Sequence, residues 1–189
     1  MDAFLISTGI VALAEIGDKT QLLALLLAAR FRRPWPIIAG IFVATLANHA
    51  LAGAVGAWLS SLAGPAVLRW VLGLSFIAMG VWILIPDRVD DGPEASAPRF
   101  GVFGTTLIAF FLLEMGDKTQ IATVALAAKY PSLLGVVAGT TVGMMLANVP
   151  AVLLGEVAAK RLPMRLVHGI AAAIFVVLGV LVLTGRSGL

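Results

Sequence analysis

The sequence contains no cysteine among its 189 residues, and only 12% of its side chains are charged. The absence of cysteine excludes disulfides, thiolate nucleophiles and thiolate metal ligands together. The scarcity of charge, combined with 60% hydrophobic residues, lies outside the usual composition of soluble globular domains. The composition therefore predicts an integral membrane protein.

Long polar segments are scarce as well. The longest is PDRVDDGPEASAPR, residues 86–99, and its proline, glycine, serine and acidic content is typical of a disordered linker. Because no soluble catalytic domain fits in the remaining polar sequence, we expect neither an enzyme nor a resident cofactor. The net charge of +3 comes from basic residues in short loops beside apolar runs, where they set topology, so we expect no nucleic-acid partner.

Apolar runs make up most of the chain. A helix needs about 20 residues to cross the hydrocarbon core of a bilayer. Six runs are long enough, and they lie at residues 3–29, 35–59, 66–85, 101–128, 132–157 and 166–184. We therefore predict an all-α, polytopic membrane protein with six transmembrane helices. The first run is too long, and too acidic at its centre, for a signal peptide, so we expect it to be retained.

The chain repeats itself at an offset of 99 residues. This offset aligns Phe4 with Phe103, Glu15 with Glu114, Gly17 with Gly116, Asp18 with Asp117, Lys19 with Lys118, Thr20 with Thr119, Gln21 with Gln120, Arg30 with Lys129, Gly40 with Gly139, Phe76 with Phe175 and Gly80 with Gly179. A shift of one more residue aligns LAN at 46–48 with LAN at 146–148. The pattern indicates a duplication of three helices.

The duplication defines two repeats, residues 1–85 and 101–189, joined by a linker at 86–100. Because three helices per repeat is an odd number, the second repeat must enter the membrane from the opposite face. The prediction is a pair of inverted repeats related by a pseudo-two-fold axis in the membrane plane. Transporters of this design bind their substrate where equivalent segments meet near the bilayer midplane.

Basic residues between the runs predict the orientation. Eight would lie on one side of the membrane, namely Arg30, Arg32, Arg33, Arg88, Arg99, Lys160, Arg161 and Arg165, and three on the other, namely Arg69, Lys129 and Arg186. The positive-inside rule places the larger group in the cytoplasm. We therefore expect a cytoplasmic linker and two termini that face outward.

Two copies of one charged motif interrupt apolar runs, EIGDKTQ at 15–21 and EMGDKTQ at 114–120. On a continuous helix the Glu, Asp and Lys of each copy would point to one face. Each charge at mid-membrane costs roughly 2.5 to 3.5 kcal/mol on insertion scales. The six charges must therefore face each other, water or an ion.

A purely structural interpretation pairs each Glu with the Lys four residues on, Glu15 with Lys19 and Glu114 with Lys118. Four carboxylates against two ammonium groups still leave two negative charges. One divalent cation or two protons would neutralise them. Ligands made only of oxygen suit calcium, magnesium and manganese better than zinc or copper. The candidate metal ligands are Glu15, Asp18, Glu114 and Asp117.

Neighbouring residues can support such a site. Hydroxyls of Thr20 and Thr119 and amides of Gln21 and Gln120 are candidate helpers, beside the lysines Lys19 and Lys118. Gly17 and Gly116 allow either local unwinding or close helix packing. Asn48 and Asn148, at matched positions, either complete the coordination or join helices. His49 has no counterpart and suits a structural role or a proton relay, whereas His168 and Glu156, near helix ends, are expected at the interface.

Metal and protons compete for the same carboxylates. If the two-proton form and the one-metal form both reorient, but the empty and doubly negative form does not, the result is obligatory exchange of a divalent cation for protons. Two alternatives remain open from the residues. One is a cation channel without proton coupling, and the other is a membrane scaffold that does not transport and whose polar motifs join helices.

The two E-x-G-D-K-T motifs resemble the signature of the Gdt-type family, formerly uncharacterised protein family sixteen, and the resemblance covers essentially the whole chain. It implies exchange of manganese or calcium for protons, with Glu15, Asp18, Glu114 and Asp117 forming the cation site. Short bacterial members are generally manganese exporters, so manganese is preferred over calcium. The implied location is a bacterial inner membrane, with both termini in the periplasm. The oligomeric state is left open.

Overall fold

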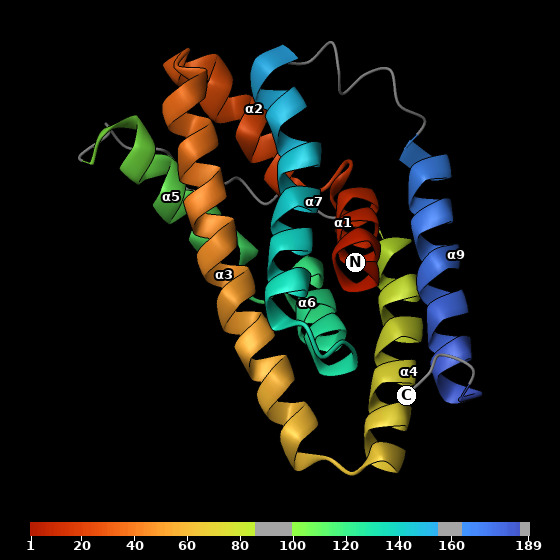
Figure 1. Cartoon of the computed structure of the whole chain (residues 1–189). Helices are drawn as coiled ribbons and strands as arrows, with labels where there is room; N and C mark the ends of the chain where they lie inside the picture. Colours follow the sequence, from red (N-terminus) through yellow and green to blue (C-terminus); the bar gives the residue numbers. More distant parts are fainter. Residues whose placement is uncertain (86–99, 155–163, 186–189) are drawn as a thin grey trace.

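The computed structural model describes residues 1–85, 100–154 and 164–185, and every regular element in these ranges is a helix. Chain order gives α1 (Asp2–Glu15), α2 (Lys19–Phe31), α3 (Pro34–Leu62), α4 (Pro65–Ile83), α5 (Gly101–Glu114), α6 (Lys118–Lys129), α7 (Leu133–Leu154) and α9 (Met164–Leu183) (Figure 1). The predicted all-α class is confirmed. The linker at 86–99 and Glu156 lie outside the described residues.

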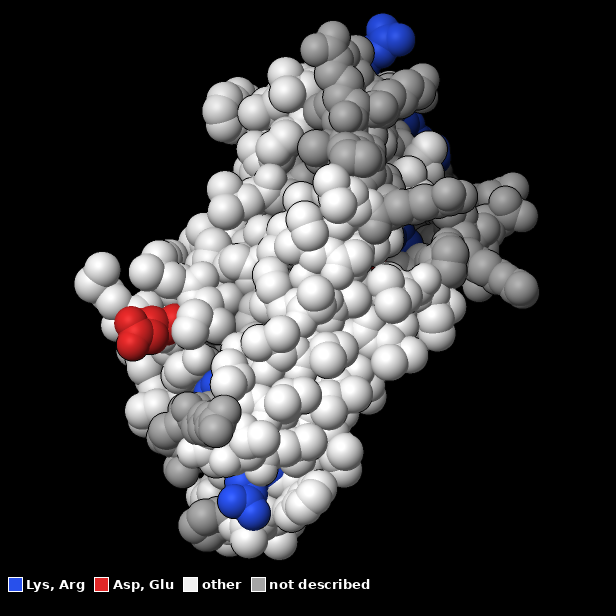
Figure 2. Space-filling view, turned by 90° about the vertical axis from the view of Figure 1, so that its right-hand side faces the viewer, with Lys and Arg blue, Asp and Glu red and all other residues white. Residues whose placement is uncertain are grey.

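Four of the described helices are long and apolar enough to cross a membrane, namely α3, α4, α7 and α9. Their outer faces carry exposed apolar side chains, on α4 and α9 for example Val67, Trp70, Val71, Leu74, Leu166 and Val177. The flank formed by α4 and α9 is covered mostly by uncharged side chains (Figure 2). Such a surface suits contact with lipid rather than water.

The other two apolar runs are not continuous helices. The first is broken between α1 and α2, and the second between α5 and α6, in both cases inside the charged motif. Gly17 and Gly116 have φ angles of 86° and 80°, in the left-handed region that glycine adopts without steric cost. The expectation that the charged side chains share one helical face is therefore wrong. Open space where a Cβ of Gly116 would lie favours unwinding over close packing as the reason for this glycine.

Corresponding helices of the two repeats make corresponding contacts. α1 packs on α7, and its counterpart α5 packs on α3. At matched points in these interfaces, a Cβ on Gly139 would lie 2.5 Å from the carbonyl oxygen of Phe4, and one on Gly40 would lie 2.9 Å from that of Phe103. Each repeat therefore holds the broken helix of the other, which brings the two motifs together.

The helices α4 and α9 form a pair of their own. Phe76 and Phe175, which are each other's counterparts in the repeat, place their ring centroids 6.2 Å apart in this interface. The pair lies side by side on one flank of the molecule, away from α2 and α5 (Figure 1). The molecule thus consists of a central group, α1, α2, α3, α5, α6 and α7, and a flanking pair.

Candidate metal centre

Each break places one carboxylate at the end of a helix and another just before the next helix begins. α1 ends at Glu15 and α5 at Glu114, while Asp18 and Asp117 precede the first residues of α2 and α6. The extended backbone of Asp18, with φ −77° and ψ 167°, is matched by Asp117, with φ −78° and ψ 169°. The two breaks therefore have the same local geometry.

A glutamine holds each break in shape. Gly17 N donates a hydrogen bond to Gln21 Oε1 at 3.0 Å, and Gly116 N donates to Gln120 Oε1 at 2.7 Å. The amide nitrogen of Gln21 then donates to the carbonyl oxygen of Ala147 on α7 at 3.0 Å. In both glutamines, the side-chain amide oxygen accepts a hydrogen bond from the glycine of the same break. The sequence suggested these amides as supporting groups of the metal site.

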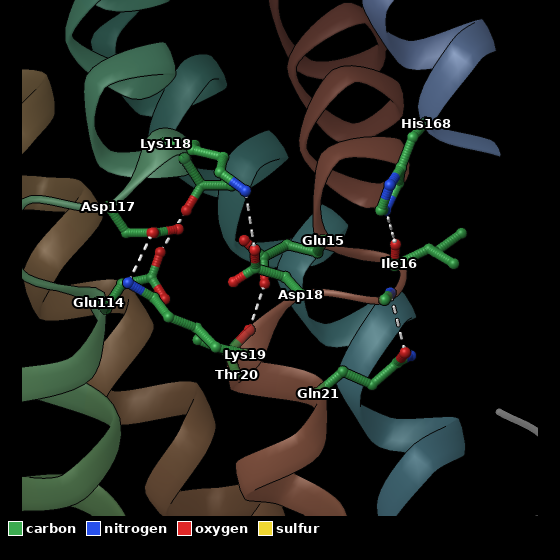
Figure 3. Close-up of polar contacts among 12 residues, drawn as sticks. Glu15, Ile16, Asp18, Lys19, Thr20, Gln21, Glu114, Asp117, Lys118 and His168 are labelled. Atoms are coloured by element: carbon green, nitrogen blue, oxygen red, sulfur yellow. Dashed lines mark hydrogen bonds and ion pairs between the residues drawn. The ribbon is translucent and has the colours of Figure 1, made fainter. Parts of the chain in front are cut away.

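Three carboxylates converge between the breaks. Glu15, Glu114 and Asp117 each have an oxygen within 4.8 Å of one from each of the others, and all three side chains are buried. Figure 3 shows Glu114 and Asp117 entering from one repeat and Glu15 from the other. Asp18 is also buried but is not part of this triangle. The grouping mixes ligand candidates from both motifs.

Threonines orient two of these carboxylates. Thr20 Oγ1 donates to Glu15 Oε2 at 2.5 Å, and Thr119 Oγ1 donates to Glu114 Oε1. Within the described part of the chain, the other oxygens, Glu15 Oε1 and Glu114 Oε2, are buried without a hydrogen-bond partner, and so is Asp117 Oδ2. A buried carboxylate oxygen without a donor is costly unless a cation or proton reaches it.

The lysines form ion pairs across the repeats. Lys19 Nζ lies 2.8 Å from Asp117 Oδ1, and Lys118 Nζ lies 3.3 Å from Asp18 Oδ1 (Figure 3). These pairs join the two breaks, in addition to any contact within one motif. Two lysines still offset only half of the four carboxylate charges in the motifs. A net charge of −2 remains for a divalent cation or two protons to neutralise.

The two asparagines behave differently. Asn48 Nδ2 donates to the carbonyl oxygen of Phe111 at 3.0 Å, and Asn48 Oδ1 accepts from Gln120 at 3.4 Å, so this side chain joins helices. Asn148 Nδ2 donates within its own helix to the carbonyl oxygen of Met144, and its Oδ1 is buried with no hydrogen-bond partner among the described residues. Asn148 is therefore the asparagine with an oxygen to offer.

The two histidines of the chain lie in different surroundings. His49 is fully buried, and neither ring nitrogen has a partner within the ranges that the structure describes. His168, near the start of α9, lies beside the first break, where its Nε2 is 2.9 Å from the carbonyl oxygen of Ile16 (Figure 3). Because a carbonyl only accepts, the ring nitrogen donates this bond. Nothing in the residues around position 168 signals this contact. The expected place of His168 at the membrane interface stays a prediction.

Comparison with known proteins identifies the family. The family described as "Divalent cation/proton antiporter GDT1" matches residues 3–91 and again residues 102–188, once for each repeat. The chain is 53% identical over 179 residues to a Vibrio cholerae protein named "Putative manganese exporter", covering 94% of this chain and 88% of the relative. It is 28% identical to a GDT1-like protein of Synechocystis, with 93% of both chains covered, and 25% identical to GDT1-like protein 5 of Arabidopsis thaliana, with 95% and 94% covered.

No solved structure gives a significant match. The family matches each repeat once, which agrees with the duplicated motif, and its members are transporters, which agrees with the apolar helices. The family comprises transporters rather than enzymes, and a multi-pass membrane protein that transports cations fits both its description and the helices described above. The chain belongs to the GDT1 family of divalent cation/proton antiporters.

Proposed function

We propose that this protein exchanges a divalent cation for protons across the membrane, with manganese preferred over calcium, and that it exports the metal from the cytoplasm. The observation that carries the proposal is the triangle of Glu15, Glu114 and Asp117, whose oxygens approach within 4.8 Å. In each of these carboxylates one buried oxygen has no hydrogen-bond donor among the described residues. A cation between them would replace the missing donors.

The chemistry of the ligands supports a hard divalent ion. Carboxylate oxygens, with the amide oxygen of Asn148 as a further candidate, are the ligand type that manganese, calcium and magnesium share. Asp117 is held by Lys19 at 2.8 Å, so binding of the metal through Asp117 would weaken that ion pair. The lysines thus compensate part of the negative charge when the metal has left. Manganese is favoured by the name of the Vibrio cholerae relative rather than by any residue here.

Protons supply the other half of the exchange. When the metal leaves, two protons on the same carboxylates would restore the charge balance that the two lysines leave incomplete. A site with −2 charge inside the membrane would not reorient readily, because the charge would cross a medium of low dielectric constant. Only the metal-loaded and the protonated forms would then change sides. This restriction would couple the two fluxes.

The proposed topology has six spans arranged as inverted repeats. Each broken helix, α1 with α2 and α5 with α6, counts as one span beside α3, α4, α7 and α9. Broken helices at membrane depth are tolerated where they line a cavity or a binding site. With the basic loops in the cytoplasm, both termini would lie in the periplasm of a bacterial inner membrane, and the linker would be cytoplasmic.

Inside-out membrane vesicles test the exchange directly. After a proton gradient is established, addition of manganese, calcium, magnesium or zinc should dissipate it for the transported metal only. Glu114→Gln should abolish this response, whereas Thr106→Val, a change at another buried polar side chain of α5, should retain it. If manganese enters equally well after the gradient is collapsed, a channel is the better description. If no metal moves and Glu114→Gln fails to fold, a scaffold is the better description.

A further inference from the structure

The flanking pair α4–α9 packs on one half of each broken helix and barely on the other half. α9 packs on α1, and α4 packs on α6. The repeat relates α1 to α5, α2 to α6 and α4 to α9, so the corresponding contacts would be α4 with α5 and α9 with α2. Neither corresponding pair forms more than slight contact in the described part of the chain. The arrangement inside the central group is paired, and that of the flanking pair is one-sided.

The hydrophobic clusters show the same one-sidedness. Leu72, Phe76 and Met79 of α4 share one buried cluster with side chains of α9, α1 and α6. The second buried cluster draws on α2, α3, α5 and α7, with no member from α4 or α9 among the described residues. Leu26 on α2 is 63% exposed, whereas its counterpart Ala125 on α6 is 4% exposed. The flanking pair therefore covers α1 and α6 and leaves α2 and α5 uncovered.

One polar contact fixes this arrangement at the first break. His168 of α9 donates to the carbonyl oxygen of Ile16, which the break has released from helical hydrogen bonding. The offset that aligns Phe76 with Phe175 also aligns Arg69 with His168 and Met115 with Ile16. Met115 is 54% exposed, and Arg69 Nε is buried without a hydrogen-bond partner in the described ranges. The second donor and the second break are thus present, but they do not meet.

We propose that α4 and α9 move together as a gate, with His168 and Arg69 as alternate latches. In the arrangement seen here, His168 holds the carbonyl of Ile16. In the other, the pair would pack on α2 and α5, Arg69 would donate to the carbonyl of Met115, and His168 would release Ile16. Both are positioning residues, since they act on the backbone of the breaks rather than on the metal. The inference rests on the proposed transport function, because it supplies the movement that exchange requires.

The exposure of the lysines indicates which side is open. In the proposed inverted topology, α1 and α6 lie on the periplasmic side of the two breaks, and α2 and α5 lie on the cytoplasmic side. The flanking pair covers the α1 and α6 side, where the Lys118 side chain is 5% exposed, whereas that of Lys19, which begins α2, is 28% exposed. In the proposed topology, this arrangement faces the cytoplasm. The second arrangement would face the periplasm.

Cross-linking tests the two arrangements in the full chain, which has no cysteine of its own. One variant carries Ile16→Cys with His168→Cys, and the matched variant carries Met115→Cys with Arg69→Cys. A short reducible bis-methanethiosulfonate should link both pairs in vesicles, and conditions that raise one yield should lower the other. Each cross-link should stop manganese-driven proton release, and reduction should restore it. The single-cysteine variants serve as controls.

The latch itself is tested on the Met115→Cys, Arg69→Cys background. His168→Ala should raise the ratio of cross-linked to uncross-linked protein by about fivefold. That is the effect of losing one ordinary hydrogen bond on a two-state equilibrium. His168→Gln keeps an N–H donor and should bring the yield back toward its starting value. Leu166→Ala, at an exposed position of the same helix, should leave it unchanged. A residue that merely stabilised the fold would not shift the yield in this selective way.

The outcomes separate the gate from the transport function. If the pair at Met115 and Arg69 never cross-links while the single-cysteine proteins transport manganese, the gate is wrong and the exchanger stands. If both pairs link reciprocally but no metal moves, the gate stands and the exchanger is wrong. A cross-link at Ile16 and His168 that leaves transport intact would also overturn the gate.

Discussion

The two charged motifs differ at a single position, Ile16 against Met115, and yet the structure encloses them differently. They share backbone angles, threonine–glutamate bonds and glutamine braces. They differ in cover, because Lys118 is buried and Lys19 is partly exposed, while Met115 is exposed and Ile16 is half-buried. A carrier whose site is open to one side of the membrane would show this combination of equal bonds and unequal burial.

The largest effects should fall where the motifs are equal. Glu15 and Glu114 are both fully buried, and both belong to the carboxylate triangle. If the triangle is one shared site, Glu15→Gln and Glu114→Gln should each lower manganese-driven proton release by about a hundredfold or more, since even the hydrogen-bond partners of ligands cost about 10- to 100-fold. Proton release in inside-out vesicles measures both. Loss in only one variant would mean that each motif binds separately.

The next effect should reveal the unequal cover. Lys118→Met removes one partner of a deeply buried ion pair and should lower the free energy of unfolding by about 3 to 5 kcal/mol. Lys19→Met also leaves a buried carboxylate, Asp117, without its partner, but water reaches this position because the Lys19 side chain is 28% exposed, so the loss should be smaller, about 1 to 3 kcal/mol. Thermal unfolding in detergent, followed by tryptophan fluorescence, compares the two. Equal losses would contradict the difference in cover.

The helical class and the duplication could be predicted from the sequence, because both follow from the pattern of apolar runs. The four acidic ligand candidates follow from residues that are costly in lipid and stay a prediction, although the structure brings Glu15, Glu114 and Asp117 together. The break between α1 and α2 could not be predicted firmly, because an apolar run through 3–29 predicts one continuous helix. Only Gly17 indicates that this helix could unwind locally. The ion pairs between repeats were missed for the same reason, since spacing rules along one helix point Lys19 toward Glu15.

The one-sided cover could not be predicted at all. The two repeats align along their length, so periodicity treats the two sides alike, and the differences at the contact, Arg69 against His168 and Met115 against Ile16, do not say which side is covered. In the proposed gate, the covered side depends on a small difference in free energy between two packings of the same helices. The sequence predicts an interfacial position for His168 because a histidine near a helix end ordinarily lies there. Its contact with the carbonyl of Ile16 depends on where α9 packs, which sequence spacing does not encode.

A smaller effect tests whether the breaks are equally demanding of the backbone. Alanine at Gly17 or Gly116 must adopt a positive φ, which should lower the free energy of unfolding by about 1 to 2 kcal/mol in each case. The matched control is Gly9→Ala inside α1, where nothing lies within 4 Å of the added Cβ. That change should stabilise the helix by up to about 1 kcal/mol. Thermal unfolding of the three variants decides, and a neutral Gly116→Ala would contradict the positive φ.

The smallest effect concerns the threonines that orient the glutamates. Thr20→Val and Thr119→Val remove the donors to Glu15 and Glu114 without changing side-chain size, and each should weaken the apparent affinity for manganese by about tenfold. Thr123→Val is the control, because that buried hydroxyl donates only to the backbone of its own helix. Manganese titration of proton release in vesicles gives the affinities.

Since the two bonds correspond in the repeats and neither depends on the flanking pair, equal losses of affinity would mean that the gate alters access to the site and not its ligands. A loss confined to Thr119 would mean that the one-sided cover extends to the metal itself.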